Sequence, residues 1–253
     1  MTKRSLHRTS RAPKRGRSAA AAASLGLVLA AGTLLTACDT GALADPGPTR
    51  TEQRPVDGVH AVDLRTGGDL TITTSATPKL TITAGRTTLR YLTSTLQDGT
   101  VVLGSRSGHV ASGDIHYVLT LPSLDGVVIA GSGSAHGTVV ADGTFTVTVS
   151  GSGSAAVDGL VATAVTVRLS GSGDIRLAGT TDAQSVELDG SGTYLGGDLT
   201  SQTSDVHIDG SGNAHVNAIN RLDAQINGSG NINYTGTPAL STQISGNGTG
   251  SAG

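Results

Sequence analysis

Gly131-Ser132-Gly133 is the first of seven similar tripeptides that recur through the second half of the chain. Their first glycines are 20, 20, 19, 20, 18 and 18 residues apart. A nearly fixed period of about 20 residues is typical of a solenoid, in which each repeat forms one coil. The later copies are Gly151-Ser152-Gly153, Gly171-Ser172-Gly173, Gly190-Ser191-Gly192, Gly210-Ser211-Gly212, Gly228-Ser229-Gly230 and Gly246-Asn247-Gly248.

A short alternating segment precedes each tripeptide, with aliphatic residues on one side and polar residues on the other. This period of two is typical of a β-strand with one buried face. A second strand follows each tripeptide, and Val139, Leu160, Leu199, Ile219 and Leu240 indicate a third, less regular one. Two inward columns are expected: Val127, Val147, Val167, Val186, Val206, Ala224 and Thr242, and then Ile129, Val149, Leu169, Leu188, Ile208, Ile226 and Ile244.

These columns predict an all-β fold, a single-stranded parallel β-helix (solenoid) with about 18–20 residues per coil. Stacked Val, Ile and Leu fill such a core, which fits an aromatic content of only 2%. The tripeptide is then the corner of each coil, because glycine tolerates the backbone conformations that a sharp turn needs. The middle residues, from Ser132 to Ser229 and Asn247, form a polar ladder that is a candidate contact surface.

The first half of the chain is less regular, but it contains a degenerate copy of the repeat. The segment 62–73 aligns with 167–178, matching Val62 to Val167 and Asp69 to Asp174. Other expected strands are Leu70–Thr74, Lys79–Ala84, Arg90–Thr95, Thr100–Gly104 and Ile115–Leu121, with a surface loop over Gly104–Gly113. The head domain is therefore expected over residues 56–253, irregular over 56–125 and regular over 126–253.

The N-terminus has the pattern of an export signal. Seven basic residues lie within the first 17 positions, and Ser18–Leu35 is uncharged and rich in Ala and Leu. Leu35-Thr36-Ala37 then precedes Cys38, the chain's only cysteine, as in a bacterial lipobox. The sequence predicts a lipoprotein signal peptide over residues 1–37, lipidation of Cys38, and a flexible tether over residues 38–55 that contains three prolines. An uncleaved membrane anchor is the alternative, and the chain leaves export by the Sec or the twin-arginine route open.

Charge then excludes one class of partner. Seven of the 17 basic residues precede Cys38 and all 19 acidic residues follow it, so the chain from Cys38 on has a net charge of −9. Nucleic-acid binding requires clustered Lys and Arg on the phosphates. We therefore expect no nucleic-acid partner, and a membrane link through the Cys38 lipid alone.

A calcium site was considered because Asp189 and Asp209 precede their tripeptides and are expected to stack, while Asp69 and Asp174 follow theirs. Calcium takes six to eight oxygen ligands, and two solvated acids explain the pattern better. The histidines that follow Cys38 show no metal-ligand spacing; they are His60, His109, His116, His136, His207 and His215. No metal or cofactor site is expected.

A carbohydrate-active enzyme is the strongest catalytic alternative, since such sites gather two acids on one face of a β-helix. Arg168, Asp174, Arg176 and Glu187 are the candidates. Alternating charges on a solvated face explain them equally well. We expect no catalytic residues and no enzyme.

Gly68-Asp-Leu-Thr-Ile72, Ile115-His-Tyr-Val-Leu-Thr-Leu-Pro-Ser-Leu124 and the repeated Gly-Ser-Gly strands resemble the putative auto-transporter adhesin, head GIN family, over about residues 56–250. The Gly-Ile-Asn tripeptide of the family's name is absent as a contiguous triplet; its nearest match is Gly230-Asn231-Ile232-Asn233. The resemblance implies an exported bacterial domain of unknown function and carries over no catalytic residue.

The sequence thus predicts a lipid-anchored, cell-surface β-solenoid on the outer face of the bacterial membrane. Its expected role is an adhesin-like binding or interaction module for cell-wall glycan or an envelope protein. A carbohydrate-active enzyme and a purely structural cell-envelope lipoprotein remain the alternatives.

Overall fold

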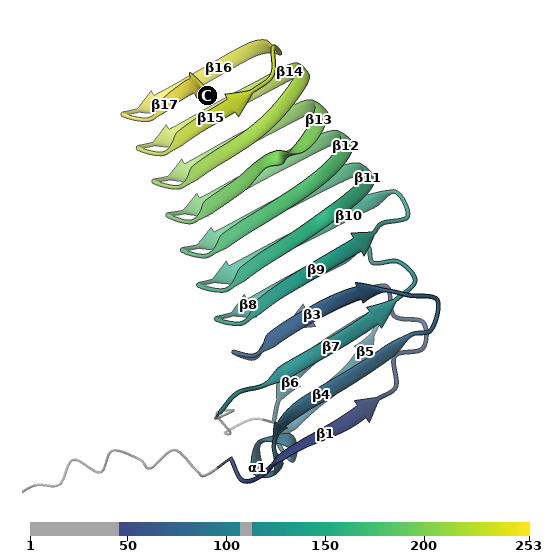
Figure 1. The fold of residues 1–253 in the computed structure, drawn as a ribbon. Helices are drawn as coiled ribbons and strands as arrows, with labels where there is room; N and C mark the ends of the chain where they lie inside the picture. Colours follow the sequence, from purple (N-terminus) through teal and green to yellow (C-terminus); the bar gives the residue numbers. More distant parts are fainter. Residues whose placement is uncertain (1–45, 107–112) are drawn as a thin grey trace, which may run out of the picture. The chain divides into compact units, whose positions relative to one another are not determined.

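The computed structural model describes residues 46–106 and 113–253, which form a stack of β-coils (Figure 1). The predicted signal over residues 1–37, the lipidation residue Cys38 and residues 107–112 of the predicted loop lie outside these residues. None of the helices among the described residues has the length and apolar character needed to cross a membrane.

The described residues contain one 17-stranded sheet and one short helix, α1 (Arg86–Leu89). The strands are β1 (Thr49–Arg54), β2 (Ala61–Leu64), β3 (Asp69–Thr74), β4 (Lys79–Gly85), β5 (Leu92–Gln97), β6 (Thr100–Ser105), β7 (His116–Leu121), β8 (Gly126–Gly131), β9 (Ser134–Val140), β10 (Thr144–Gly151), β11 (Ser154–Gly171), β12 (Asp174–Gly190), β13 (Thr193–Gly210), β14 (Asn213–Gly228), β15 (Asn231–Thr235), β16 (Ala239–Gly246) and β17 (Thr249–Ala252).

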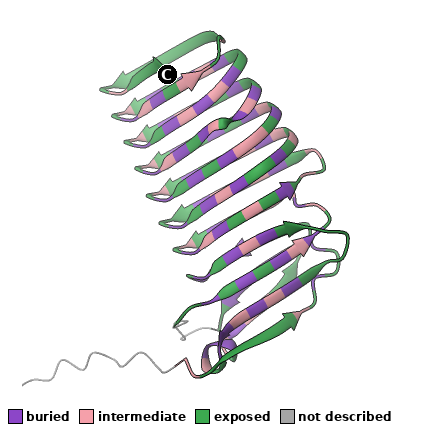
Figure 2. Ribbon diagram, in the orientation of Figure 1, coloured by how far each residue is buried: buried purple, intermediate pink, exposed green. Residues whose placement is uncertain are grey.

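The parallel β-helix predicted from the repeat is confirmed from β8 to β17. Val147 pairs with Val127 on one side and with Val167 on the other, as the predicted inward column requires. Both predicted columns are buried as far as Ala224 and Ile226, so burial alternates along each middle coil (Figure 2). These side chains belong to one continuous hydrophobic core.

Each regular coil has two faces, joined by the Gly-Ser-Gly corner at one edge and by a bend at the other. β11 to β14 each run from one corner to the next as a single bent strand. The third strand is therefore not a separate element. Val139, Leu160 and Leu199 are buried at the bend, whereas Ile219 and Leu240 are 41% and 48% exposed.

Both glycines of the corner are needed, for different reasons. Gly171 has a φ of 121°, and a Cβ there would lie 2.4 Å from the carbonyl oxygen of Gly151 in the previous coil. A Cβ on Gly173 would lie 2.1 Å from the carbonyl oxygen of Gly153. The backbone N–H of Ser172 donates to the Gly151 carbonyl at 2.9 Å. The corner stacks directly on its neighbour, and no larger residue fits at either glycine.

The degenerate copy is also confirmed. Val62 of β2 pairs with Val127 of β8, and Asp69 of β3 pairs with Ser134 of β9. The order of coils in space nevertheless differs from their order in the chain. β6 pairs with the edge of β2 that faces away from β8, and β7 pairs with the edge of β3 that faces away from β9. The coil of β2 and β3 therefore lies between β6–β7 and β8–β9 in space, although it precedes all four strands in the chain.

The stack is closed beyond β6 and β7 by antiparallel strands. β4 pairs with β7, β1 with β4, and β5 with β6. Val56, Leu80, Ile82 and Leu89 are buried there, and α1 contributes Leu89 to this part of the core. This closed end is the part of the fold that the repeat period did not predict.

β1 corrects the predicted tether, because Thr49–Arg54 lies inside the segment 38–55. The strand pairs with β4 from Thr49 to Arg54 through its backbone, while its side chains are exposed except for the half-buried Arg54. A strand with no buried face has no hydrophobic alternation, and the sequence therefore did not show it.

Candidate functional site

The bend is the variable part of the coil. The corners keep strict register, whereas register shifts occur between Val157 and Leu160, between Arg176 and Gly179, and between Gly196 and Thr200. The differences in coil length of one or two residues are therefore absorbed at this edge. Irregularities of this kind are frequent where a sheet carries a site.

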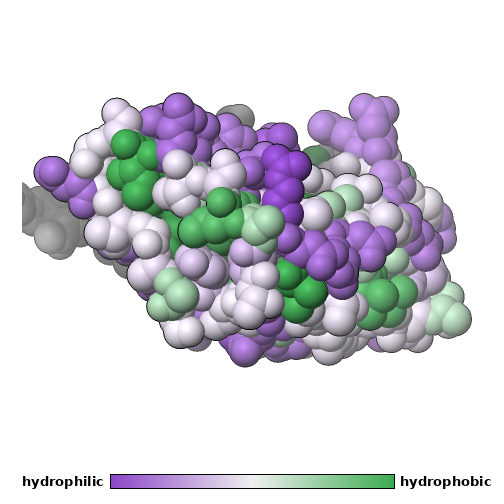
Figure 3. All heavy atoms as spheres, turned by 90° about the horizontal axis from the view of Figure 1, so that it is seen from above, coloured by the Kyte–Doolittle hydropathy of each residue, from purple (hydrophilic) through white to green (hydrophobic). Residues whose placement is uncertain are grey.

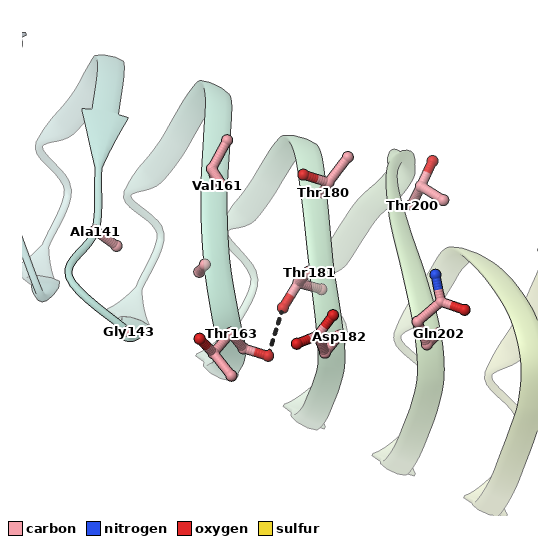
Figure 4. A pocket seen from close by; sticks show the side chains of 10 residues that line it. Ala141, Gly143, Val161, Thr163, Thr180, Thr181, Asp182, Thr200 and Gln202 are labelled. Carbon is pink, nitrogen blue, oxygen red and sulfur yellow. Dashed lines mark hydrogen bonds between the residues drawn. The ribbon is translucent and has the colours of Figure 1, made fainter.

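An open groove of about 380 Å³ follows the bend across four neighbouring coils (Figure 4). With about 4.8 Å between strands, the groove extends for roughly 14 Å along the stack. Small, hydroxyl and amide side chains dominate its lining, and Asp182 is the one charged residue among the described residues that line it. The lining residues are Ala141, Gly143, Val161, Ala162, Thr163, Thr180, Thr181, Asp182, Thr200 and Gln202.

The groove is held by hydrogen bonds between coils. The hydroxyl of the buried Thr181 donates to the pair of carbonyl oxygens of Thr163 and Ala183, at 3.2 and 3.0 Å. The Asn220 amide donates to Oε1 of Gln202 at 3.1 Å. Val161, which is 63% exposed, pairs with Thr180, and Thr180 pairs with Thr200. Such a lining offers hydroxyl, amide and carboxylate groups beside one apolar contact.

A buried polar network supports the groove from inside. The Tyr194 hydroxyl donates to Oε1 of Gln184 at 2.9 Å, and Nε2 of Gln184 donates to the hydroxyls of Ser201 and Ser204 at 2.9 and 2.8 Å. The Ser201 hydroxyl lies 2.9 Å from the Asn217 carbonyl oxygen. Burial raises the pKa of Tyr194 well above its usual range. Each member has a partner, so the network fixes how successive coils meet at the bend.

The four aspartates that the sequence offers as possible calcium ligands lie on two different faces. Asp189 and Asp209 pair in adjacent coils, as predicted, whereas Asp69 and Asp174 belong to the column of the opposite face. A side-chain hydrogen bond from Asn227, and then the bond with His207 at 3.1 Å, hold the pKa of Asp209 below its usual range. Among residues 46–106 and 113–253, no three His, Cys, Asp or Glu side chains are grouped to hold a metal ion.

The four residues weighed as a carbohydrate-processing set are also divided. Arg168 and Glu187 form an ion pair of 3.4 Å on one face. Asp174 and Arg176 lie on the other, where Arg176 pairs with Asp158 at 3.0 Å and Asp198 at 2.8 Å. The structure does not bring the predicted set together.

The histidines are dispersed over the surface. His136 and His215 share one outward column, separated by the coils of β11 to β13, as the sequence predicts. His60 lies 3.3 Å from Asp125, and His116 lies 3.9 Å from Asp69. His109 lies outside the described residues.

The predicted polar ladder runs along the corner edge, opposite the bend. Its members are exposed, and the second glycine of most corners is buried. The ladder thus remains accessible to a partner. The bend groove was missed, because runs such as Thr180-Thr181-Asp182 carry a weak signal that resembles any surface strand.

A model of the family described as "Putative auto-transporter adhesin, head GIN domain" matches residues 59–238. This match covers more than half of the chain. The chain belongs to this family. The head GIN resemblance inferred from the sequence is therefore confirmed, and the family description is that of an adhesin-type protein.

Solved structures of similar fold support the solenoid. A putative adhesin from Bacteroides fragilis superimposes with a TM-score of 0.76 at 23% identity, covering 81% of this chain and 97% of that one. A putative lipid binding protein from Parabacteroides distasonis superimposes with a TM-score of 0.68 at 23% identity, covering 82% of this chain and 97% of that one. A putative adhesin from the same species superimposes with a TM-score of 0.60 at 20% identity, covering 82% of this chain and 98% of that one. At these identities the likeness establishes the fold alone.

A comparison with curated proteins finds no match to this head GIN chain.

Proposed function

We propose that the protein is an exported, lipid-anchored adhesin-like module that binds a polar partner of the cell envelope. The anchor is assigned to Cys38, where a basic start, an uncharged Ala/Leu segment and small residues precede the only cysteine. Membership of the head GIN family supports a binding role. The outer face of the bacterial cell membrane is the corresponding location.

The bend groove is the observation that carries this proposal. It crosses four coils and is lined by hydroxyl, amide and carboxylate groups beside Val161. A linear groove of this chemistry suits an extended polar ligand, namely a cell-wall glycan strand or a segment of an envelope protein. None of the described residues that line the groove is aromatic, so these residues offer no ring for stacking on a sugar. Each contact is therefore expected to be weak, and adhesion to depend on many copies acting together.

Crosslinking on intact cells, followed by mass spectrometry of the captured material, tests the proposal. We expect wild type to recover a glycan or an envelope protein, and Asp182→Lys in the groove to reduce the recovery. Asp174→Lys is the matched control, because it makes the same exposed change in the same strand but on the corner side. Equal loss in both variants, or no captured partner, would contradict the groove as the binding surface.

Cys38→Ala tests the anchor separately. The proposal predicts that the variant leaves the membrane fraction and that metabolic labelling with a fatty acid is lost. Membrane retention equal to wild type would refute lipidation at Cys38. Recovery of a glycan product with changed length would instead favour the carbohydrate-active alternative, and the absence of any partner the structural one.

A further inference from the structure

The coil formed by β16 and β17 leaves one end of the stack open. β16 pairs with β14 and β17 pairs with β15, and no described strand pairs with their outer edges. Every residue of both strands is exposed (Figure 2). Leu240, Thr242 and Ile244 occupy inward columns that are buried in the preceding coils, yet Leu240 is 48% and Ile244 41% exposed.

The strands of this open end carry no charged side chain. Asp223 is the last charged residue, and the 30 residues from Ala224 to Gly253 contain no Asp, Glu, Lys or Arg. Small hydrophobic patches lie among near-neutral and hydrophilic atoms when the molecule is viewed from this side (Figure 3). Edge strands that remain single are normally protected by charges, by proline or by a covering segment. β16 and β17 themselves contain no charged residue and no proline, Pro238 lies just before β16, and no described segment covers their outer edges.

The other end is protected. β1 is the outermost strand of one face and carries Arg50, Glu52 and Arg54. β5, the outermost strand of the other face, is flanked by Arg90 and Asp98. The core beneath them is closed, so an open end cannot stack on this end as another coil. Head-to-tail growth into a filament is therefore disfavoured.

We propose that the open end binds the open end of a second copy of this chain. A single partner strand would cover one sheet edge and leave the other exposed. A second copy presents the same two strands and the same inward columns, so both edges and the core between them are covered together. A two-fold axis across the stack pairs the strands antiparallel and forms a closed, isologous dimer. The absence of charged side chains removes the side-chain repulsion that identical ends would otherwise have.

Pairing of open ends would make adhesion between opposing cells homophilic, a step that rests on the proposed function and its anchor at Cys38.

Sedimentation velocity on the chain from Cys38 onward, whose described part has its own continuous core, tests the dimer. We expect the wild-type sedimentation coefficient to rise with concentration to that of a dimer. Thr242→Lys should raise the dissociation constant by about tenfold or more, because an inward-pointing charge opposes edge pairing. Gln53→Lys, the same added charge on the closed end, should leave it within about twofold. A wild type that stays monomeric at all concentrations would overturn the proposal, and so would equal weakening in the two variants.

Beads coupled through the thiol of Cys38 test the contact between surfaces. Wild-type beads should aggregate with one another, Thr242→Lys beads should not, and Gln53→Lys beads should aggregate like wild type. Dimers in solution without bead aggregation would refute the contact between opposing surfaces. If Asp182→Lys abolishes capture of an envelope partner while bead aggregation persists, the groove and the open end are separate sites. If beads fail to aggregate while that capture remains, the homophilic proposal alone is wrong.

Discussion

The two ends of the solenoid are built by opposite means. At the closed end, β4 and β5 run antiparallel to the stack, β1 runs antiparallel to β4, and Leu80 and Ile82 of β4 are buried. At the open end, β16 and β17 add one more coil, whose inward residues no described segment covers. The period of the repeat determines the middle of such a fold but not its ends, which depend on irregular sequence or on a partner.

The largest effect is expected from breaking a corner in the middle of the stack. Gly171→Val should lower the free energy of unfolding by roughly 3–5 kcal/mol, since it combines an unfavourable φ with a clash against the Gly151 carbonyl. Gly246→Val makes the same clash against Gly228 but should cost less than about 1 kcal/mol globally, because only the last coil is lost. Urea unfolding compares the two.

Gly143→Ala is the control for that comparison. Gly143 has a φ of 107°, but a Cβ there has no neighbour within 4 Å, so only backbone strain of about 1–3 kcal/mol is expected. If Gly171→Val lowers the free energy of unfolding no more than Gly143→Ala does, the stacking contact between corners is unimportant.

Truncating leucine should separate the two ends directly. Leu80→Ala in β4 removes a fully buried side chain and should cost about 2–5 kcal/mol. Leu240→Ala in β16 removes a side chain that is 48% exposed and should cost less than about 1 kcal/mol. Thermal melts of dilute protein measure both variants. An equal fall in melting temperature in the two would mean that the open end is covered.

The buried network beneath the groove should give an intermediate effect. Tyr194→Phe leaves Oε1 of Gln184 without its donor and should cost about 1–3 kcal/mol. Tyr117→Phe at the closed end is the comparison, because the Tyr117 hydroxyl bonds only the buried Thr66 at 3.0 Å. Chemical denaturation of both variants measures the difference, and an unchanged stability for Tyr194→Phe would contradict the network.

Alkaline pH should act on stability through the two buried tyrosines. Burial raises the pKa of both Tyr194 and Tyr117, so the folded state keeps these protons after the unfolded state has lost them. Stability should be unaffected by these groups below about pH 10 and fall above it, by up to about 1.4 kcal/mol per pH unit for each tyrosine. The free energy of unfolding of Tyr194→Phe should fall less steeply above pH 10 than that of wild type. The same slope in both proteins would contradict the buried tyrosines as the cause.

The sequence was sufficient for the middle of the fold. The period, the two inward columns and the alignment of Val62 with Val167 are all in the observed register. They were predictable because in-register stacking places like residues on like residues. The passage of β6 and β7 outside β2 and β3 was not, since alternation shows that a strand forms but not which edge it joins.

Less of the candidate site was predictable. The corner glycines were identified with their structural role, and the stacking of Asp189 on Asp209 was predicted. The bend groove and the Tyr194–Gln184 network were missed, because inward-facing Gln and Ser at a bend resemble surface residues in the sequence. Exposure of Ile244 at the open end was missed for the related reason that a column shows spacing but not what covers its last member.

The difference between the ends is the central claim, and hydrogen–deuterium exchange on dilute, monomeric protein tests it most directly. The account predicts slow exchange in β4, β7 and the coils from β11 to β13, and the fastest strand exchange in β16 and β17. Protection of β16 and β17 equal to that of β13, or faster exchange in β4 and β7 than in β16, would contradict it.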